Sequence, residues 1–391
     1  MNRALVLSAL LLLNLPFHAG AAEPRQPVGG EALDRQITAL MAREEVVGLA
    51  VAIIDHGEIT HLGAYGHRNL ARGLPLETDT IMYGASLTKA AFAYMVLQLV
   101  DEGLLDLDRS IADYLAKPLS EYKEYRAFAG DDTWRALTPR IILSHRTGLS
   151  NLRYLEPDRQ PRFHFAPGTH YAYSGEGFWV LQRVLEYGLG LDIKEEMRKR
   201  VFEPFGLIHT DMQWRESFAD NLADGYAMDG SFEPHDERSN VSASGSMDTT
   251  IADQAKLWQA MFAGERLSEE MRAEWVRAQF PIRTQQKFPT VQMHATHVSG
   301  GEESQLAAGL GIEVWKGQNG PAFAKGGHNP WTANLVICQA QAERCLVMLA
   351  NSVRAEIIFP ALAELILGET AYPWWWVYPS LHGPDAAGDA D

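Results

Sequence analysis

Apolar residues follow strand patterns near both ends of the chain. Residues 48–54 form an apolar run rich in strand-favouring residues, His56-Gly57 marks a turn, and residues 58–65 predict a second strand. Toward the other end, four short apolar runs predict further strands: 310–315, 321–324, 333–337 and 346–350. Helical periodicity flanks these groups at residues 30–43 and 355–367. Strands at both ends that follow one another as hairpins predict a single, largely antiparallel sheet.

The middle of the chain has a different pattern. Residues 105–261 are mostly helical in periodicity, with loops marked by Pro and Gly, and a strong helix is predicted over residues 86–102, ending at Gly103. We therefore expect an α+β fold, in which a largely antiparallel sheet built from both chain ends is flanked by helices and carries an inserted, mainly helical subdomain. A catalytic cleft is expected between these two parts.

These patterns predict one domain over residues 23–368. Its sheet part covers about residues 30–105 and 300–368, and its helical part about residues 106–299. A C-terminal tail, residues 369–391, follows the domain.

The first 22 residues predict a signal peptide. Arg3 supplies a positive start, residues 4–17 are largely apolar, and Ala19-Gly20-Ala21 resembles a cleavage site. The alternative is a membrane anchor, but the run is short for a bilayer and Pro16 interrupts it. We expect a secreted protein of a bacterial periplasm.

Charge and composition restrict the partners. The 391 residues include 34 Lys and Arg against 50 Asp and Glu, a formal net charge of −16. An acidic surface disfavours nucleic acid and anionic membranes. The expected partner is a small-molecule or peptide substrate, with no nucleic acid, and the oligomeric state is left open.

The two cysteines, Cys338 and Cys345, flank a short connection between two predicted strands. A hairpin would bring them together, so a disulfide is expected in an oxidising compartment, and two small buried hydrophobic residues are the alternative. Two Cys with no matching His pair do not make a zinc site, and His294 and His297 are interpreted as exposed loop residues. No metal and no cofactor are predicted.

Candidate chemistry begins at Ser86-Leu87-Thr88-Lys89, where the strong helix opens. Residues three apart share a helix face, so the Lys89 amine can approach the Ser86 hydroxyl and activate it as a nucleophile. Unpaired N–H groups at the helix N-terminus favour a developing negative charge. A second match, Ser120-Glu121-Tyr122-Lys123, lies in a polar segment and is interpreted as chance.

Two further motifs follow. Tyr173-Ser174-Gly175 leads into a predicted helix, and its tyrosine could act as a general base if a nearby ammonium group lowers its pKa. Lys325-Gly326-Gly327-His328 follows a predicted strand, where the glycines would let the backbone approach a substrate. The alternatives are a packing tyrosine and a simple Gly-Gly turn.

These motifs, in this order, resemble the serine β-lactamase and penicillin-binding-protein superfamily. The similarity is to its class C-like branch, which includes family VIII esterases, D-aminopeptidases and DD-carboxypeptidases and carries S-x-x-K, Y-x-N and K-T-G or H-x-G motifs. Three flanking segments are also similar to landmarks of that branch: residues 137–149, Pro204-Phe205-Gly206-Leu207 and Ala243-Ser244-Gly245-Ser246-Met247. The resemblance covers roughly residues 30–367.

The resemblance implies roles for the motif residues. Ser86 would be acylated, and Lys89 and Tyr173 would form the coupled base, with the neutral partner left open because interacting groups titrate as a pair. The backbone N–H groups of Ser86 and His328 would form the oxyanion hole. Lys325 would orient the Tyr173 phenol or a substrate carboxylate. His145, in the first flanking segment, is expected to be a packing residue, whereas the side chain of His328 is left open.

The chain also departs from the pattern of the branch. Gly175, Gly326 and Gly327, together with Lys325, are the expected substrate-binding positions. Gly175 replaces the asparagine of Y-x-N, and Gly326 and His328 replace hydroxyl residues of K-T-G-[ST]. Losing these polar contacts disfavours a β-lactam substrate.

Two other features stay open at this stage. Glu176, beside the tyrosine motif, would either pair with a substrate amine or lie on the surface at the start of a helix. Trp374-Trp375-Trp376 is expected to fold back onto the protein, with a partner or a membrane surface as alternatives, and residues 383–391 are expected to be disordered.

The leading functional prediction is an exported serine hydrolase that forms an acyl-enzyme on Ser86 from ester or peptide-amide substrates. The alternatives are a β-lactamase or DD-carboxypeptidase, a non-catalytic penicillin-binding or cell-wall-binding protein, and an acyltransferase.

Overall fold

The computed structural model describes residues 29–287, 305–317 and 320–383. The predicted signal peptide, His294, His297 and residues 384–391 of the tail lie outside the described residues. Among the described residues, no helix is long and apolar enough to cross a membrane.

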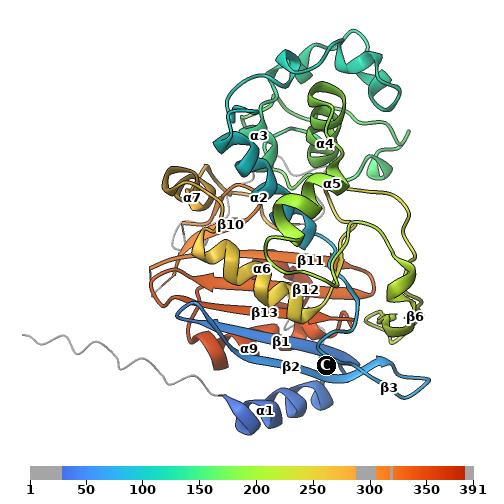
Figure 1. Ribbon diagram of the computed structural model, residues 1–391, viewed down its shortest axis with the longest axis vertical. Helices are drawn as coiled ribbons and strands as arrows, with labels where there is room; N and C mark the ends of the chain where they lie inside the picture. The colour runs from blue at the N-terminus through green and yellow to red at the C-terminus, as the bar shows by residue number, and fades with distance from the viewer. Residues whose placement is uncertain (1–28, 288–304, 318–319, 384–391) are drawn as a thin grey trace, which may run out of the picture.

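A nine-stranded antiparallel sheet, counted over the described residues, forms the lower half of the molecule (Figure 1), with the order β3-β2-β1-β13-β12-β11-β10-β9-β8. Its strands are β1 Gly48–Asp55, β2 Glu58–Asn69, β3 Leu74–Pro75, β8 Phe280–Pro281, β9 Ala307–Ala308, β10 Glu313–Gly317, β11 Gly320–Asn329, β12 Thr332–Gln339 and β13 Arg344–Ala350. The two chain ends meet where β1 pairs with β13, from Leu49 opposite Ala350 to Asp55 opposite Arg344. This arrangement confirms the predicted α+β fold, with an antiparallel sheet built from both ends of the chain.

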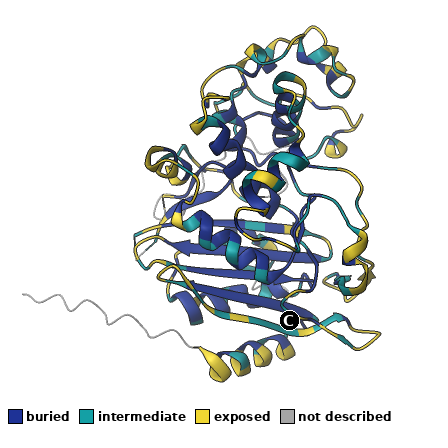
Figure 2. Cartoon of the chain, viewed as in Figure 1, coloured by how far each residue is buried: buried dark blue, intermediate teal, exposed yellow. Residues whose placement is uncertain are grey.

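Each face of the sheet packs against its own set of helices. Alternate residues of β1 enter two separate cores, because successive side chains of a strand point to opposite faces. One core takes up α2 Leu87–Asp101 and α6 Ile251–Ala263, and the other takes up α1 Gly30–Arg43 and α9 Ala355–Leu367. In Figure 1, α6 crosses the front of the sheet while α1 lies below it. Figure 2 shows the central strands buried between these layers.

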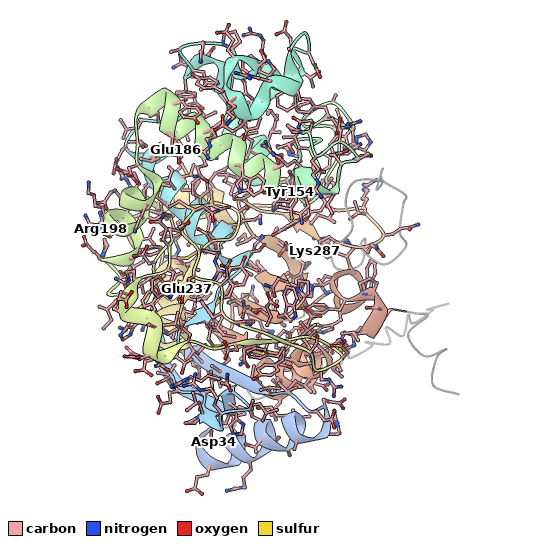
Figure 3. The ribbon with its side chains drawn as sticks, turned by 90° about the vertical axis from the view of Figure 1, so that its right-hand side faces the viewer. Asp34, Tyr154, Glu186, Arg198, Glu237 and Lys287 are labelled. Carbon is pink, nitrogen blue, oxygen red and sulfur yellow. A yellow bond between two sulfur atoms is a disulfide. The ribbon has the colours of Figure 1, made fainter. Side chains whose placement is uncertain are left out.

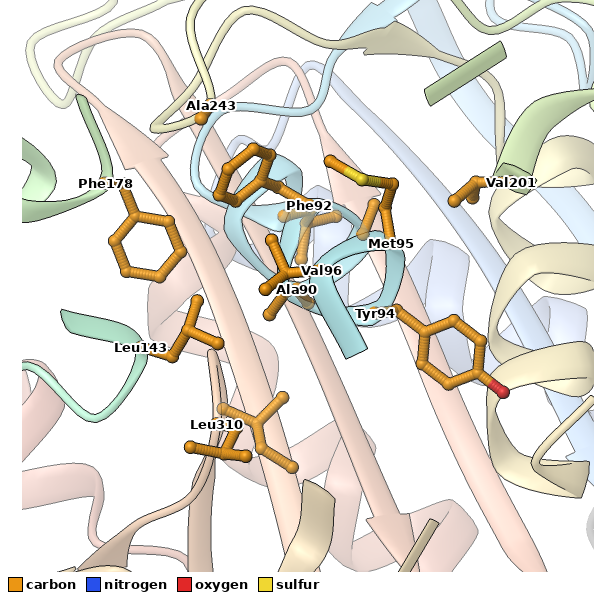
Figure 4. Packing of buried hydrophobic residues seen from close by; sticks show 14 of the residues in the cluster. Ala90, Phe92, Tyr94, Met95, Val96, Leu143, Phe178, Val201, Ala243 and Leu310 are labelled. Carbon is orange, nitrogen blue, oxygen red and sulfur yellow. The ribbon is translucent and has the colours of Figure 1, made fainter. Parts of the chain in front are cut away.

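The helical part, above the sheet in Figure 1, is built around α2. Every residue of α2 from Leu87 to Leu99 is buried, so the helix is a central core element without an exposed face. Figure 4 shows its apolar side chains packed between Phe178 and Leu143 on one side and Val201 on the other. Around it lie α3 Pro139–Leu143, α4 Gly175–Leu189, α5 Ile193–Met197 and α7 Glu269–Val276, with 3₁₀ turns and loops between them.

Strand β11 is longer than predicted. It continues through the Lys325-Gly326-Gly327-His328 motif to Asn329, because β12 keeps pairing with it as far as Thr332. The motif therefore lies inside a strand, and the expectations that it follows a strand or forms a turn are wrong. On the neighbouring hairpin, Cys338 and Cys345 face each other across β12 and β13 and form a disulfide.

The C-terminal tail folds back onto the protein as α10 Trp374–Val377 and α11 Pro379–His382. Trp376 is 1% exposed and packs in the same core as α1 and α9, whereas Trp374 and Trp375 are only partly buried. The tryptophan cluster thus covers apolar surface of the chain itself.

Candidate active site

Ser86 lies at the junction between a short strand and the central helix. β4 Met82–Tyr83 pairs with β7 Asp248–Thr249, and the chain then turns sharply through Ala85, whose φ is +47°. This left-handed conformation is costly for a residue with a Cβ and is found where the surrounding structure enforces it. Ser86 follows as the N-cap residue of α2, half-buried, with its side chain free of a capping hydrogen bond to the helix.

The Lys89 amine lies one helical turn further on and points back at Ser86. Its Nζ donates to Ser86 Oγ at 3.0 Å and to the carbonyl of Ser244 at 2.6 Å. Ser244 belongs to a segment that the sequence singled out, and that segment is held to α2 by a hydrogen bond from Met247 N to Thr88 Oγ1. Burial, with the ammonium groups of Lys325 and Lys287 nearby, holds the pKa of Lys89 well below its usual value.

Tyr173 lies among three lysines. The nitrogens of Lys325, Lys89 and Lys287 are 4.8, 5.1 and 5.2 Å from the centre of its ring. Burial raises the pKa of Tyr173, while Lys287 and a hydrogen bond with Ser86 act in the opposite direction. The net directions are therefore opposite, because the pKa of Tyr173 is raised while that of Lys89 is lowered.

Glu313 supplies the counter-charge for this cluster. Its carboxylate is 2.7 Å from Lys287 Nζ and 3.9 Å from Lys325 Nζ, and all three side chains are almost completely buried. Although burial raises the pKa of Glu313, the two lysines outweigh it and the net pKa is lowered. Sequence reasoning missed both Lys287 and Glu313. A glutamate inside the apolar run 310–315 was the available signal, whereas nothing around Lys287 marked it.

His145 packs against the Tyr173 ring. Its Nδ1 accepts a hydrogen bond from Ser174 N at 3.1 Å, and its ring lies 4.2 Å from the Tyr173 ring. Burial and the nearby lysines hold the pKa of His145 well below its usual value, so the ring stays neutral. This position is that of a packing and positioning histidine.

The edge of β11 lies directly against the Ser86 turn. A Cβ on Gly327 would meet the Gly84 carbonyl at 2.5 Å and Ser86 N at 3.2 Å, so only glycine allows this approach. By contrast, a Cβ on Gly326 would meet only the Asn334 carbonyl, at 3.6 Å. The fold thus brings the motif backbone beside the Ser86 amide, and the oxyanion hole formed by the Ser86 and His328 N–H groups stays a prediction.

Gly175, which stands in place of the asparagine of Y-x-N, and the neighbouring Glu176 both make specific contacts within the protein. Asn151 accepts a hydrogen bond from Gly175 N at 3.0 Å, and a Cβ on Gly175 would approach the Asn151 carbonyl to 2.9 Å. Glu176 is completely buried and forms a two-pronged ion pair with Arg153. The expectation of a surface position for Glu176 is therefore wrong, and its carboxylate is paired with Arg153.

These elements enclose a cavity of about 350 Å³ beside Ser86. Figure 3 labels one lining residue, Lys287, near mid-height, between the helical part above and the sheet part below. The full lining is Ser86, Asn151, Tyr173, Lys287, Gly326, Gly327, His328, Glu356, Val377, Tyr378, Pro379 and Ser380. Lys123, from the second Ser-x-x-Lys match that was interpreted as chance, is exposed and does not line this cavity.

His328 also lines this cavity, and its side chain contacts a second lining residue. Its Nδ1 is 2.6 Å from a carboxylate oxygen of Glu356 on α9. Glu356 is therefore a carboxylate that lines the cavity, and sequence reasoning did not identify it.

The fold has counterparts among solved structures. It is that of the penicillin-binding proteins: a D-alanine carboxypeptidase AmpC from Burkholderia cenocepacia superposes with a TM-score of 0.67 over 86% of this chain and 97% of that one, at 20% identity. An octameric penicillin-binding protein homologue from Pyrococcus abyssi gives the same TM-score over 87% of this chain and 77% of that one, at 19% identity.

The chain belongs to the Beta-lactamase family, whose model matches residues 33–367. A lovastatin esterase from Penicillium rubens is 30% identical over 49% of this chain and 56% of its own length. A D-aminopeptidase from Brucella anthropi is 29% identical over 41% of this chain and 32% of its own length. An unguisins hydrolase from Aspergillus violaceofuscus is 26% identical over 62% of this chain and 46% of its own length. The chain thus spans about half the length, or less, of these curated relatives.

Proposed function

We propose that this protein is an exported serine hydrolase that forms an acyl-enzyme on Ser86 from ester or peptide-amide substrates. The observation that carries the proposal is the pair formed by Ser86 Oγ and Lys89 Nζ, 3.0 Å apart, in which a buried amine with a lowered pKa points at the hydroxyl. A neutral amine has a lone pair that can accept the Ser86 proton, whereas the ammonium group of an ordinary lysine at neutral pH has no free lone pair.

Acylation then follows from the geometry. Ser86 Oγ attacks the substrate carbonyl carbon while its proton passes to Lys89 Nζ, which becomes an ammonium group. The oxyanion forms at the helix N-terminus and is stabilised by the backbone N–H groups of Ser86 and His328. When the tetrahedral intermediate collapses, the bond to the leaving alcohol or amine breaks. The phenol of Tyr173 protonates the leaving group and regains its proton from Lys89.

Deacylation repeats these steps with water. A water molecule takes the place of the leaving group, and the Tyr173–Lys89 pair accepts its proton as it attacks the acyl carbon. Collapse releases a carboxylic acid and returns the proton to Ser86 Oγ. Lys325 and Lys287, both near the Tyr173 ring, stabilise the phenolate that forms transiently in either direction.

Esters and peptide amides rank above β-lactams for this site. Gly175 carries no side-chain amide, and the space beside it is occupied by Asn151. Relatives named as an esterase, a D-aminopeptidase and a hydrolase support the same ranking.

The proposal is tested with a panel of p-nitrophenyl acetate, a D-amino-acid amide, a D-Ala-D-Ala peptide and nitrocefin. We expect turnover of the ester or an amide that is lost in Ser86→Ala and kept in Ser120→Ala. A burst of product without steady turnover would instead indicate a binding protein, and ester products formed with an added alcohol would indicate an acyltransferase. Export is tested separately, by N-terminal sequencing of the protein recovered from a periplasmic fraction.

A further inference from the structure

The C-terminal tail contributes one wall of the catalytic cavity. Four consecutive residues, Val377, Tyr378, Pro379 and Ser380, line it beside Ser86. The family model ends at residue 367, so this wall comes from outside the matched span. The tail is therefore a feature of the active site that membership in the family does not supply.

The wall is fixed to the catalytic machinery on two sides. The backbone N–H of Lys287 donates to the Trp376 carbonyl at 2.9 Å, and Trp376 Nε1 donates to Thr284 Oγ1 at 3.0 Å. On the other side, His382 Nε2 donates to the Glu356 carbonyl at 3.0 Å. Because a buried ring and three hydrogen bonds hold it, the wall is rigid enough to select among bound groups.

The position of the wall indicates which part of a substrate it meets. Trp376 lies against Lys287, whose Nζ is 5.7 Å from the Trp376 ring centre and 5.2 Å from the Tyr173 ring centre. Tyr173 is the proton donor to the departing group in the proposed mechanism. The departing alcohol or amine must therefore lie on the Tyr173 and Lys287 side, where Trp376 anchors the start of the tail.

We propose that the tail residues 377–380 form the leaving-group subsite, with Tyr378 setting the size of the alcohol or amine that the enzyme accepts. This inference rests on the proposed function. The whole cavity of about 350 Å³ is at the small end of ligand cavities, which span about 300 to 1,000 Å³. The subsite thus takes compact leaving groups, such as a single-ring phenol or one amino acid, in preference to fused rings.

The test compares phenyl acetate with 1-naphthyl acetate. Both esters form the same acetyl-enzyme, so deacylation is common to them and kcat/KM differs only through the leaving group. The ratio of the two kcat/KM values is measured within one preparation, so any loss of folded protein cancels. We expect Tyr378→Ala to raise the naphthyl-to-phenyl ratio by about tenfold, since a few carbons in a pocket are worth that much or more.

Three further variants control the comparison. Ser380→Phe, at an exposed lining position, adds bulk and should lower the ratio. Tyr378→Phe keeps the ring, and Trp375→Ala removes a tail ring that does not line the cavity, so both should leave the ratio within about twofold. An unchanged ratio in both Tyr378→Ala and Ser380→Phe, with the Ser86 adduct still formed, overturns this inference alone. Absence of any Ser86 adduct in the wild-type enzyme overturns the proposed function, and this inference with it.

Discussion

Burial, Lys325 and Lys287, in that order, lower the pKa of Lys89, so Lys287 should contribute to setting the pH at which the enzyme becomes active. Its nitrogen and that of Lys89 are 5.2 and 5.1 Å from the same ring centre, so the two lie no more than about 10 Å apart. At an effective dielectric constant of about 20, two unit charges at that distance repel by about 1.7 kcal/mol, slightly more than a tenfold change in an equilibrium. The Lys287 ammonium therefore helps keep Lys89 neutral, which is the form that accepts the Ser86 proton.

The substitution Lys287→Met removes this repulsion and leaves Glu313 to favour the charged form of Lys89. The pKa of Lys89 then rises. Because its neutral form exists above that pKa, activity falls at a higher pH than in the wild-type enzyme as the pH is lowered. We expect kcat/KM for p-nitrophenyl acetate on the acid limb to fall about tenfold, with the plateau at higher pH less affected.

The assay is a pH profile of kcat/KM, which reports groups of the free enzyme. Lys256→Met is the matched control, because this exposed lysine bonds to the Gly206 carbonyl outside the cavity. An acid limb that stays in place, or that moves to lower pH in Lys287→Met, would refute the electrostatic reasoning.

Three other substitutions test the geometry of the site. Gly327→Ala should lower kcat at least tenfold through its clash with the Ser86 turn, whereas Gly326→Ala should stay near wild type, and equal effects would contradict the close approach of β11. Gly175→Asn should lower the midpoint of thermal unfolding without creating nitrocefin turnover, because its Cβ meets the Asn151 carbonyl, and a gain in nitrocefin hydrolysis would count against this packing. Glu176→Gln should reduce the free energy of unfolding by about 3 kcal/mol in urea titrations while activity per folded molecule persists; a selective loss of amine-bearing substrates would instead place Glu176 in the site.

The parts that sequence predicts well are those that depend on local spacing. The approach of Lys89 to Ser86 follows from three residues of helix, and β1 and β13 are continuous apolar runs because both faces of the sheet are covered. The length of β11 was underestimated, because glycines weaken a strand pattern even where the neighbouring strand keeps pairing with them.

The parts that sequence does not reveal depend on distant contacts. Lys287 joins the cluster only because the chain after α7 returns beside Tyr173. Tyr173 lies more than a hundred positions before Lys287 in the sequence. Glu356 looks like an ordinary helical residue until α9 places it beside His328. The tryptophan cluster was visible in the sequence. Only the folded chain shows that Trp376 anchors the tail residues 377–380, which line the cavity.

The central claim is that Ser86 becomes covalently acylated, and mass spectrometry of the labelled protein tests it most directly. The enzyme is incubated with a fluorophosphonate or penicillin probe, digested with trypsin, and compared with Ser86→Ala. The account predicts one adduct, on the peptide spanning residues 73–89, with fragment ions that place it on Ser86. No adduct with either probe, or an adduct on a different peptide, would contradict the account.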